Sequence, residues 1–88
     1  MKIVRSASAG TMESSDAYIE IEPATGLEIQ LESVVQQQFG QEIRSAVEEM
    51  LRENGVEDAS VRIIDRGALE CVIRARVETA ILRGKGEN

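Results

Sequence analysis

The chain has 88 residues, with 16 acidic and 10 basic side chains, a net charge of −6, no His, no Trp and one Cys. This charge repels phosphate backbones and anionic lipids, and no signal peptide or long apolar run is present, so we expect a cytoplasmic protein without nucleic-acid or membrane partners. The absence of His removes the usual nucleophile–base pairs and Cys/His metal sites, and no acidic run has calcium-loop spacing, so we expect neither an autonomous enzyme nor a metal site.

The first segment, residues 1–16, has no sustained hydrophobic period and is rich in Ser, Ala and Gly. Such a composition favours a flexible arm that is extended or loosely packed. Its end, Gly10–Asp16, is rich in turn-forming residues, and read locally it is a turn that exposes Ser14.

Two alternating segments follow, residues 17–22 and 27–32, separated by the turn-forming residues 23–26. Apolar and polar side chains alternate strictly in both segments, which predicts an antiparallel hairpin with one buried face. The outward positions of the two strands carry Glu20, Glu22, Glu28 and Glu32. This acidic face is expected to be solvated, and the alternative is a docking surface for basic partners.

Helical spacing begins after Ser33, which forms a capping box with Gln36, and predicts a helix over residues 34–53. A short apolar segment, residues 61–64, predicts a third strand. Residues 68–83 fit both periods, and their length favours a helix.

The last predicted helix contains two residues of interest. Arg76 is expected near its apolar face, where it either snorkels to solvent or contacts another subunit. Cys71 is expected to be a small buried residue. Residues 84–88 have no apolar side chain and are expected to fray.

The predicted fold is therefore a small α+β domain spanning residues 1–88, with the order strand, strand, helix, strand, helix. We expect a three-stranded antiparallel sheet with both helices on one face and the acidic face open.

Three blocks of sequence, in this order, resemble the gamma chain of citrate lyase, the acyl carrier protein of that enzyme. They are Gly10–Asp16, Gln38–Arg44 and Asp65–Arg76. Met12 stands where that family usually has Leu, and Ser15 places a second hydroxyl beside Ser14. The register counted from Gly10 favours Ser14 as the modified serine.

The resemblance implies that Ser14 carries a covalent prosthetic group, 2'-(5''-phosphoribosyl)-3'-dephospho-coenzyme A, through a phosphodiester bond. The neighbours that would present this serine to the attaching transferase are Gly10, Glu13, Ser15 and Asp16.

The same resemblance implies the partners and the reaction. The carrier would hold acetyl and citryl thioesters between the alpha subunit, an acyl transferase, and the beta subunit, a citryl lyase, during cleavage of citrate to acetate and oxaloacetate. The chain itself would supply no catalytic residue.

Two alternatives stay open. The carrier of a malonate-decarboxylase-like system uses a related prosthetic group. A non-carrier acidic interaction module would use the same small fold without any modification of the serine segment.

Overall fold

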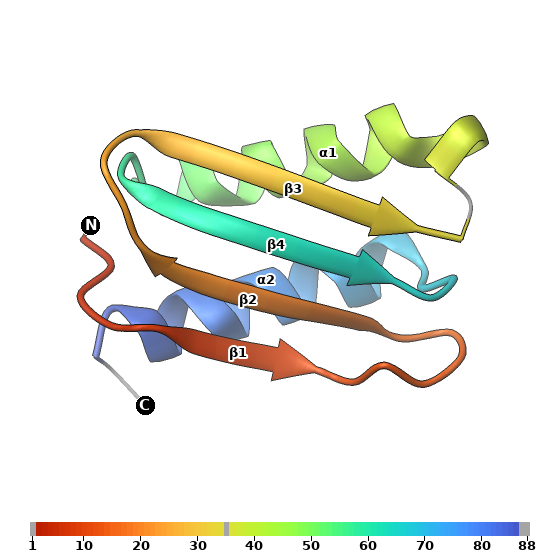
Figure 1. Cartoon of the computed structure of the whole chain (residues 1–88), viewed down its shortest axis with the longest axis horizontal. Coiled ribbons are helices and arrows are strands. Elements are labelled where there is room, and N and C mark those ends of the chain that lie inside the picture. The colour runs from red at the N-terminus through yellow and green to blue at the C-terminus, as the bar shows by residue number, and fades with distance from the viewer. Residues whose placement is uncertain (1, 35, 87–88) are drawn as a thin grey trace.

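The computed structural model describes residues 2–34 and 36–86, which form a mixed four-stranded sheet with two helices on one face (Figure 1). In chain order the elements are β1 (Ala7–Gly10), β2 (Ala17–Pro23), β3 (Leu27–Ser33), α1 (Gln36–Glu53), β4 (Ala59–Asp65) and α2 (Glu70–Gly84). The α+β class, both helices and the three expected strands agree with the sequence patterns. The prediction of a three-stranded antiparallel sheet is wrong.

The strand order is β1-β2-β4-β3, with β3 parallel to β4 and the other pairs antiparallel. Thus β2 and β3 are not a hairpin, because β4 lies between them. Helix α1 provides the long connection that a parallel pair requires. The central place of β4 follows from its composition, since Val61, Ile63 and Ile64 are all buried and gain most from neighbours on both sides.

The fourth strand, β1, comes from the segment that we expected to be part of a loose arm. Its register pairs Ala7 with Ile21 and Gly10 with Tyr18, and Ala9 is buried. Ala, Ser and Gly give little hydrophobic contrast, so the alternation of this edge strand was not visible in the sequence. The expectation of a loosely packed arm is therefore wrong for residues 7–10 and for Ile3, which is buried in the core, and the mobility of the other residues stays a prediction.

The core lies between the sheet and the two helices. Helix α2 packs on β1 and β2, and α1 packs on β3 and on α2. The fully buried large side chains include Ile19, Ile21, Val61 and Ile63 of the sheet, with Val47, Leu51, Ile73, Val77 and Ile81 of the helices. No helix within residues 2–34 and 36–86 is long and apolar enough to cross a membrane.

The end of α2 is held against the sheet and the N-terminal segment. Gly84 is buried, and a Cβ there would lie 3.2 Å from Ile21 Cγ2. Its carbonyl accepts hydrogen bonds from the amides of Val4 (2.9 Å) and Arg5 (3.1 Å). The expected fraying of residues 84–88 is thus wrong for Gly84, while residues 87 and 88 lie outside the described residues.

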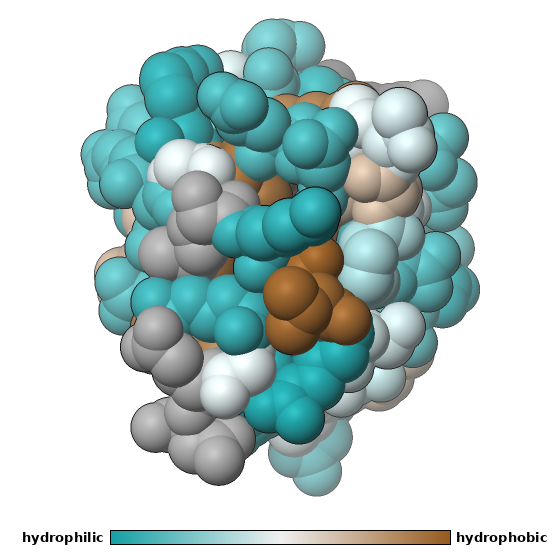
Figure 2. All heavy atoms as spheres, turned by 90° about the vertical axis from the view of Figure 1, so that its left-hand side faces the viewer, coloured by the Kyte–Doolittle hydropathy of each residue, from teal (hydrophilic) through white to brown (hydrophobic). Residues whose placement is uncertain are grey.

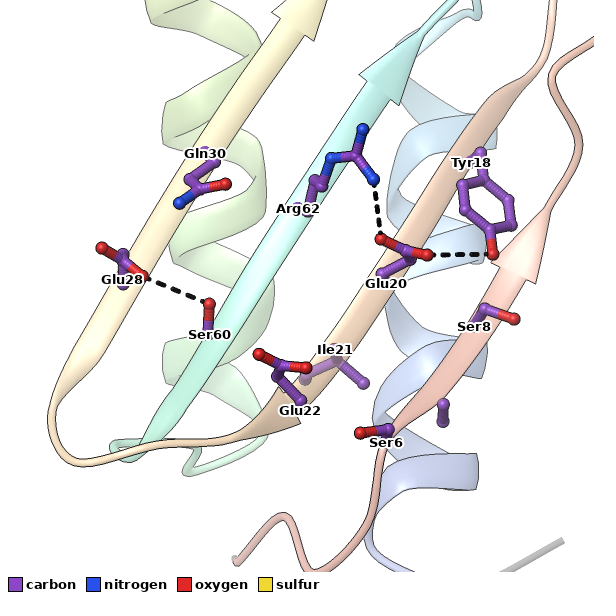
Figure 3. Close-up of a pocket in the computed structure, with 11 residues that line it drawn as sticks. Ser6, Ser8, Tyr18, Glu20, Ile21, Glu22, Glu28, Gln30, Ser60 and Arg62 are labelled. Atoms are coloured by element: carbon purple, nitrogen blue, oxygen red, sulfur yellow. Dashed lines mark hydrogen bonds and ion pairs between the residues drawn. The ribbon is translucent and has the colours of Figure 1, made fainter.

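The opposite face of the sheet is open and polar, and a hollow of ≈ 470 Å³ lies on it (Figure 3). Because β4 separates β2 from β3, Arg62 and Ser60 stand between the expected glutamates. Arg62 forms an ion pair with Glu20 (3.0 Å), and Ser60 donates a hydrogen bond to Glu28 (3.3 Å). The face is therefore less uniformly acidic than the hairpin prediction implied.

Candidate functional site

Ser14 lies in the connection between β1 and β2, at the corner of a β-turn. The amide of Asp16 donates to the carbonyl of Glu13 (3.2 Å), which makes Ser14 and Ser15 the central residues of the turn. Ser14 is exposed, and within residues 2–34 and 36–86 its hydroxyl has no hydrogen-bond partner. Its oxygen is therefore accessible to another molecule without loss of an internal contact.

Ser15 is exposed as well, but its backbone is constrained. Its φ of 68° lies in the left-handed region, which the third residue of a type II turn requires and which non-glycine residues seldom adopt. Its amide donates to the carbonyl of Arg66 (2.9 Å). The two candidate serines thus differ. The backbone of Ser15 is hydrogen-bonded to the connection after β4, and that of Ser14 is not.

The carboxylate of Asp16 joins the turn to helix α2. It accepts two hydrogen bonds from the Arg76 guanidinium, Nε to Oδ1 (3.0 Å) and Nη2 to Oδ2 (3.1 Å). It also accepts hydrogen bonds from the Thr11 hydroxyl and the Ala17 amide, both 2.7 Å long. A carboxylate with a bidentate arginine and two further donors fixes both ends of the turn.

These contacts change the acidity of Asp16. The hydrogen bond from Arg76, followed by those from Thr11 and Ala17, lowers the pKa of this carboxyl from 3.8 to about 2. Asp16 is therefore ionised near neutral pH, with its charge already paired inside the chain.

A second attachment ties the turn to the end of β4. The amide of Arg66 donates to the carbonyl of Asp16 (2.9 Å), and together with the bond from Ser15 this continues the β2–β4 ladder beyond its last pair. The base of the turn is thus held by both β4 and α2, while Ser14 projects from its corner.

Gly10 is the last residue of β1, at the start of the connection that contains Ser14. Its φ is 91°, and a Cβ there would lie 1.8 Å from the carbonyl oxygen of Ala17 and 3.2 Å from Arg76 Cδ. No side chain fits in this space, so glycine is required for the close approach of the two strands. Glu13 is exposed, and its backbone closes the turn.

The structure therefore brings together all five residues that we selected, and adds Arg76, Arg66 and Thr11 to them. Arg76 is separated from Asp16 by 60 residues. The sequence indicated only that Arg76 lies near the apolar side of a helix, and neither expected role included an ion pair within the chain. Arg74, in contrast, pairs within its helix with Glu70 (3.0 Å), four residues before it, and also reaches Glu49 (2.7 Å).

Two other features do not belong to this turn. Cys71 is exposed, so the expectation that it is buried is wrong. Within residues 2–34 and 36–86, no group of three or more His, Cys, Asp or Glu side chains has a geometry able to hold a metal ion.

The chain is similar to known carriers over nearly its whole length. A family model described as "ACP: Malonate decarboxylase delta subunit (MdcD)" matches residues 4–84. A citrate lyase acyl carrier protein of Salmonella paratyphi A is 53% identical over 94% of this chain and 88% of its own. The citrate lyase acyl carrier protein of Latilactobacillus sakei is 47% identical over 99% of this chain and 87% of its own.

The fold is also found among solved structures. A chain in the crystal structure of a Pseudomonas malonate decarboxylase hetero-tetramer, in complex with malonate, superimposes with a TM-score of 0.79 at 23% identity. The match covers 94% of this chain and 87% of that one. The extent of these similarities, together with an exposed serine on a firmly held turn, shows that the chain belongs to the citrate lyase acyl carrier protein family.

Proposed function

We propose that this acyl carrier protein is modified on Ser14 with 2'-(5''-phosphoribosyl)-3'-dephospho-coenzyme A, through a phosphodiester bond to Oγ. The observation that carries the proposal is the exposed Ser14 at the corner of a turn whose base is bonded to β4 and α2. A group attached there projects into solvent from a defined point of the molecule.

The residues around Ser14 suit a phosphodiester. The nearest partly buried charge is Asp16, whose carboxylate is already paired with Arg76, so an added phosphate does not meet an unpaired anion there. Arg66 provides a further exposed cation beside the turn. Because the Ser14 side chain makes no hydrogen bond within the described ranges, attachment leaves the bonds of the turn intact.

The group, when bound, supplies a thiol that holds an acyl chain as a thioester. The protein supplies the oxygen of Ser14 and a fixed base for the tether, and no residue of the chain acts as a catalytic acid or base. A short flexible link keeps the acyl group at an effective concentration on the order of millimolar for a docked partner. The docked carrier thus passes its acyl group between active sites within one complex, without a new diffusional encounter for each step.

The partners that we propose are the alpha and beta subunits of citrate lyase and the attaching transferase, acting in the cytoplasm on acetyl and citryl thioesters as citrate is cleaved to acetate and oxaloacetate. The relatives named as citrate lyase carriers are 45–53% identical to this chain, whereas the chain in the malonate decarboxylase structure is 23% identical. This difference favours the citrate lyase system.

Co-expression with the attaching transferase tests the modification site. We expect the intact mass of the wild type and of Ser15→Ala to increase by the mass of the prosthetic group, and that of Ser14→Ala to stay unchanged. A mass increase in Ser14→Ala that disappears in Ser15→Ala would assign the modification to Ser15. No increase in any variant, with an active transferase, would reject the carrier mechanism.

A further inference from the structure

A second feature lies at the same end of the molecule as the Ser14 turn. A groove of ≈ 310 Å³ separates the N-terminal parts of α1 and α2, and Phe39, Leu69 and Ile73 line it. Phe39 is 46% exposed and Leu69 is 72% exposed. Single exposed apolar side chains are common, but two large ones that line one groove indicate a surface for binding another molecule.

The groove is continuous with the serine turn through the connection between β4 and α2. The backbone of Arg66, at the start of this connection, is hydrogen-bonded to Ser15 and Asp16, and Leu69, at its end, lines the groove. Three residues of chain span at most about 11 Å, which limits the distance between the two sites. Figure 1 shows the β1–β2 turn, the end of β4 and the start of α1 at one end of the sheet.

The rim of the groove is acidic. Glu42 and Glu70 line it, and Glu42 is exposed and forms no ion pair with the residues that the structure describes. Asp65 also lines the groove, but this carboxylate is buried and accepts hydrogen bonds from Ser33, Gly67 and Ala68. Glu70 is ion-paired with Arg74 (3.0 Å), so the unpaired charge that the rim offers to a partner is that of Glu42.

We infer that this groove is the docking site of a protein that acts on the group at Ser14, and that this protein presents a large apolar side chain flanked by Lys or Arg. The inference rests on the proposed function. The apolar side chain fills the groove between Phe39 and Leu69, and a basic side chain meets Glu42.

The other candidate occupant is the prosthetic arm of the carrier itself. That arm carries phosphates, and a citryl group adds carboxylates, so its charges are repelled by the glutamate rim. A basic protein segment has the complementary charge. The rim thus favours a partner protein over the arm.

The opposite end of the molecule supplies a matched control. Figure 2 shows that this end is mostly hydrophilic, with apolar side chains scattered among polar ones. Leu27 is 45% exposed there, nearly the same as Phe39, and lines another groove of ≈ 350 Å³. Replacing Leu27 removes a similar apolar surface far from the serine turn.

The test compares Phe39→Ser/Leu69→Ser with Leu27→Ser, each as the full chain fully modified on Ser14 as judged by intact mass. Binding to the purified alpha and beta subunits is measured by calorimetry, with circular dichroism as the check of folding. We expect the double variant to bind at least one subunit about tenfold or more weakly, since truncating central apolar contacts has effects of this size. Leu27→Ser should bind as the wild type does.

A second variant separates charge from packing. Glu42→Lys should weaken the same binding and reduce its dependence on salt, while Glu42→Gln should have a smaller effect. Binding of the double variant that equals the wild type would overturn the inference. Chemical-shift changes at Leu69 and Ile73 on modification of the isolated carrier would assign the groove to the arm and overturn it as well. Absence of the mass increase in the wild type would instead reject the proposed function.

Discussion

The two connections that flank β2 are built differently although each contains a glycine with positive φ. Gly10, before the Ser14 turn, has a φ of 91°, and Gly26, between β2 and β3, has a φ of 78°. A Cβ on Gly10 would meet the carbonyl oxygen of Ala17, whereas a Cβ on Gly26 would meet nothing within 4 Å. Only the first glycine is required by its surroundings as well as by its dihedral angle.

The connection that contains Ser14 also makes more hydrogen bonds to the rest of the chain than the connection between β2 and β3 does. Among the residues that the structure describes, Gly26 is hydrogen-bonded only to Asp58 and Ala59. Its amide donates to the Asp58 carboxylate (2.8 Å), and its carbonyl accepts from the Ala59 amide (3.0 Å). The serine turn adds the bidentate bond between Asp16 and Arg76 to its backbone bonds with Arg66. Tertiary contacts are thus concentrated where the prosthetic group is expected, and they fix its point of attachment.

The largest expected difference is between Gly10→Ala and Gly26→Ala. The first variant combines backbone strain with overlap against a strand, and should lower the free energy of unfolding by about 3 kcal/mol or more. The second has strain alone and should lower it by about 1 kcal/mol. Urea unfolding measures both, and equal losses would contradict the close packing at Gly10.

Arg76→Ala should loosen the serine turn without disturbing the far connection. Loss of the guanidinium frees the base of the turn, so the rate of attachment by the transferase should fall on the order of tenfold. Amide hydrogen exchange at Ser15 and Ala17 should become faster. Arg76→Lys should recover only part of the rate, because lysine does not form the bidentate bond.

The control for this variant is Arg52→Ala, which removes an exposed arginine at the C-terminal end of α1. Its attachment rate and exchange should equal those of the wild type. An unchanged rate in Arg76→Ala would show that the turn is positioned without the ion pair.

Acid should weaken the serine turn selectively. The folded pKa of Asp16, about 2, is below its ordinary value of 3.8, so its contribution to stability is complete above pH 3.8. This contribution is lost as the pH falls from 3.8 through about 2. The difference in Tm between the wild type and Asp16→Asn should therefore shrink over this interval. A difference that is constant between pH 5 and pH 2 would show that Asp16 is not paired in this way.

The smallest expected effect is that of Ser15→Gly. Glycine accepts the left-handed conformation at no steric cost, and the relief of strain should raise the free energy of unfolding by up to about 1 kcal/mol after the entropic cost of glycine. Attachment at Ser14 should be retained. Destabilisation in calorimetric melts would mean that the Ser15 side chain supports the turn.

The elements with a strong hydrophobic period were predicted well. The alternating segments correspond to β2 and β3, and the predicted helices, residues 34–53 and 68–83, match α1 and α2 to within two residues at each end. Strand pairing was predicted wrongly, because alternation shows which face is buried and not which strand is the neighbour. The insertion of β4 depends on the crossover through α1, a tertiary feature that no local pattern records.

The candidate site was predictable in part. The residue types of the turn indicated an exposed Ser14, and the family resemblance identified the segment. The ion pair between Asp16 and Arg76 was not predictable, since it joins residues 60 positions apart on different elements. The positive φ of Ser15 was also hidden, because serine gives no signal for the left-handed region as glycine does.

The central claim is that Ser14 carries the prosthetic group, and the most direct measurement is the intact mass of this chain isolated from its native complex, followed by fragmentation. We predict an increment equal to the phosphoribosyl dephospho-coenzyme A group, located on Ser14. An unmodified Ser14 in a catalytically active complex would contradict the account.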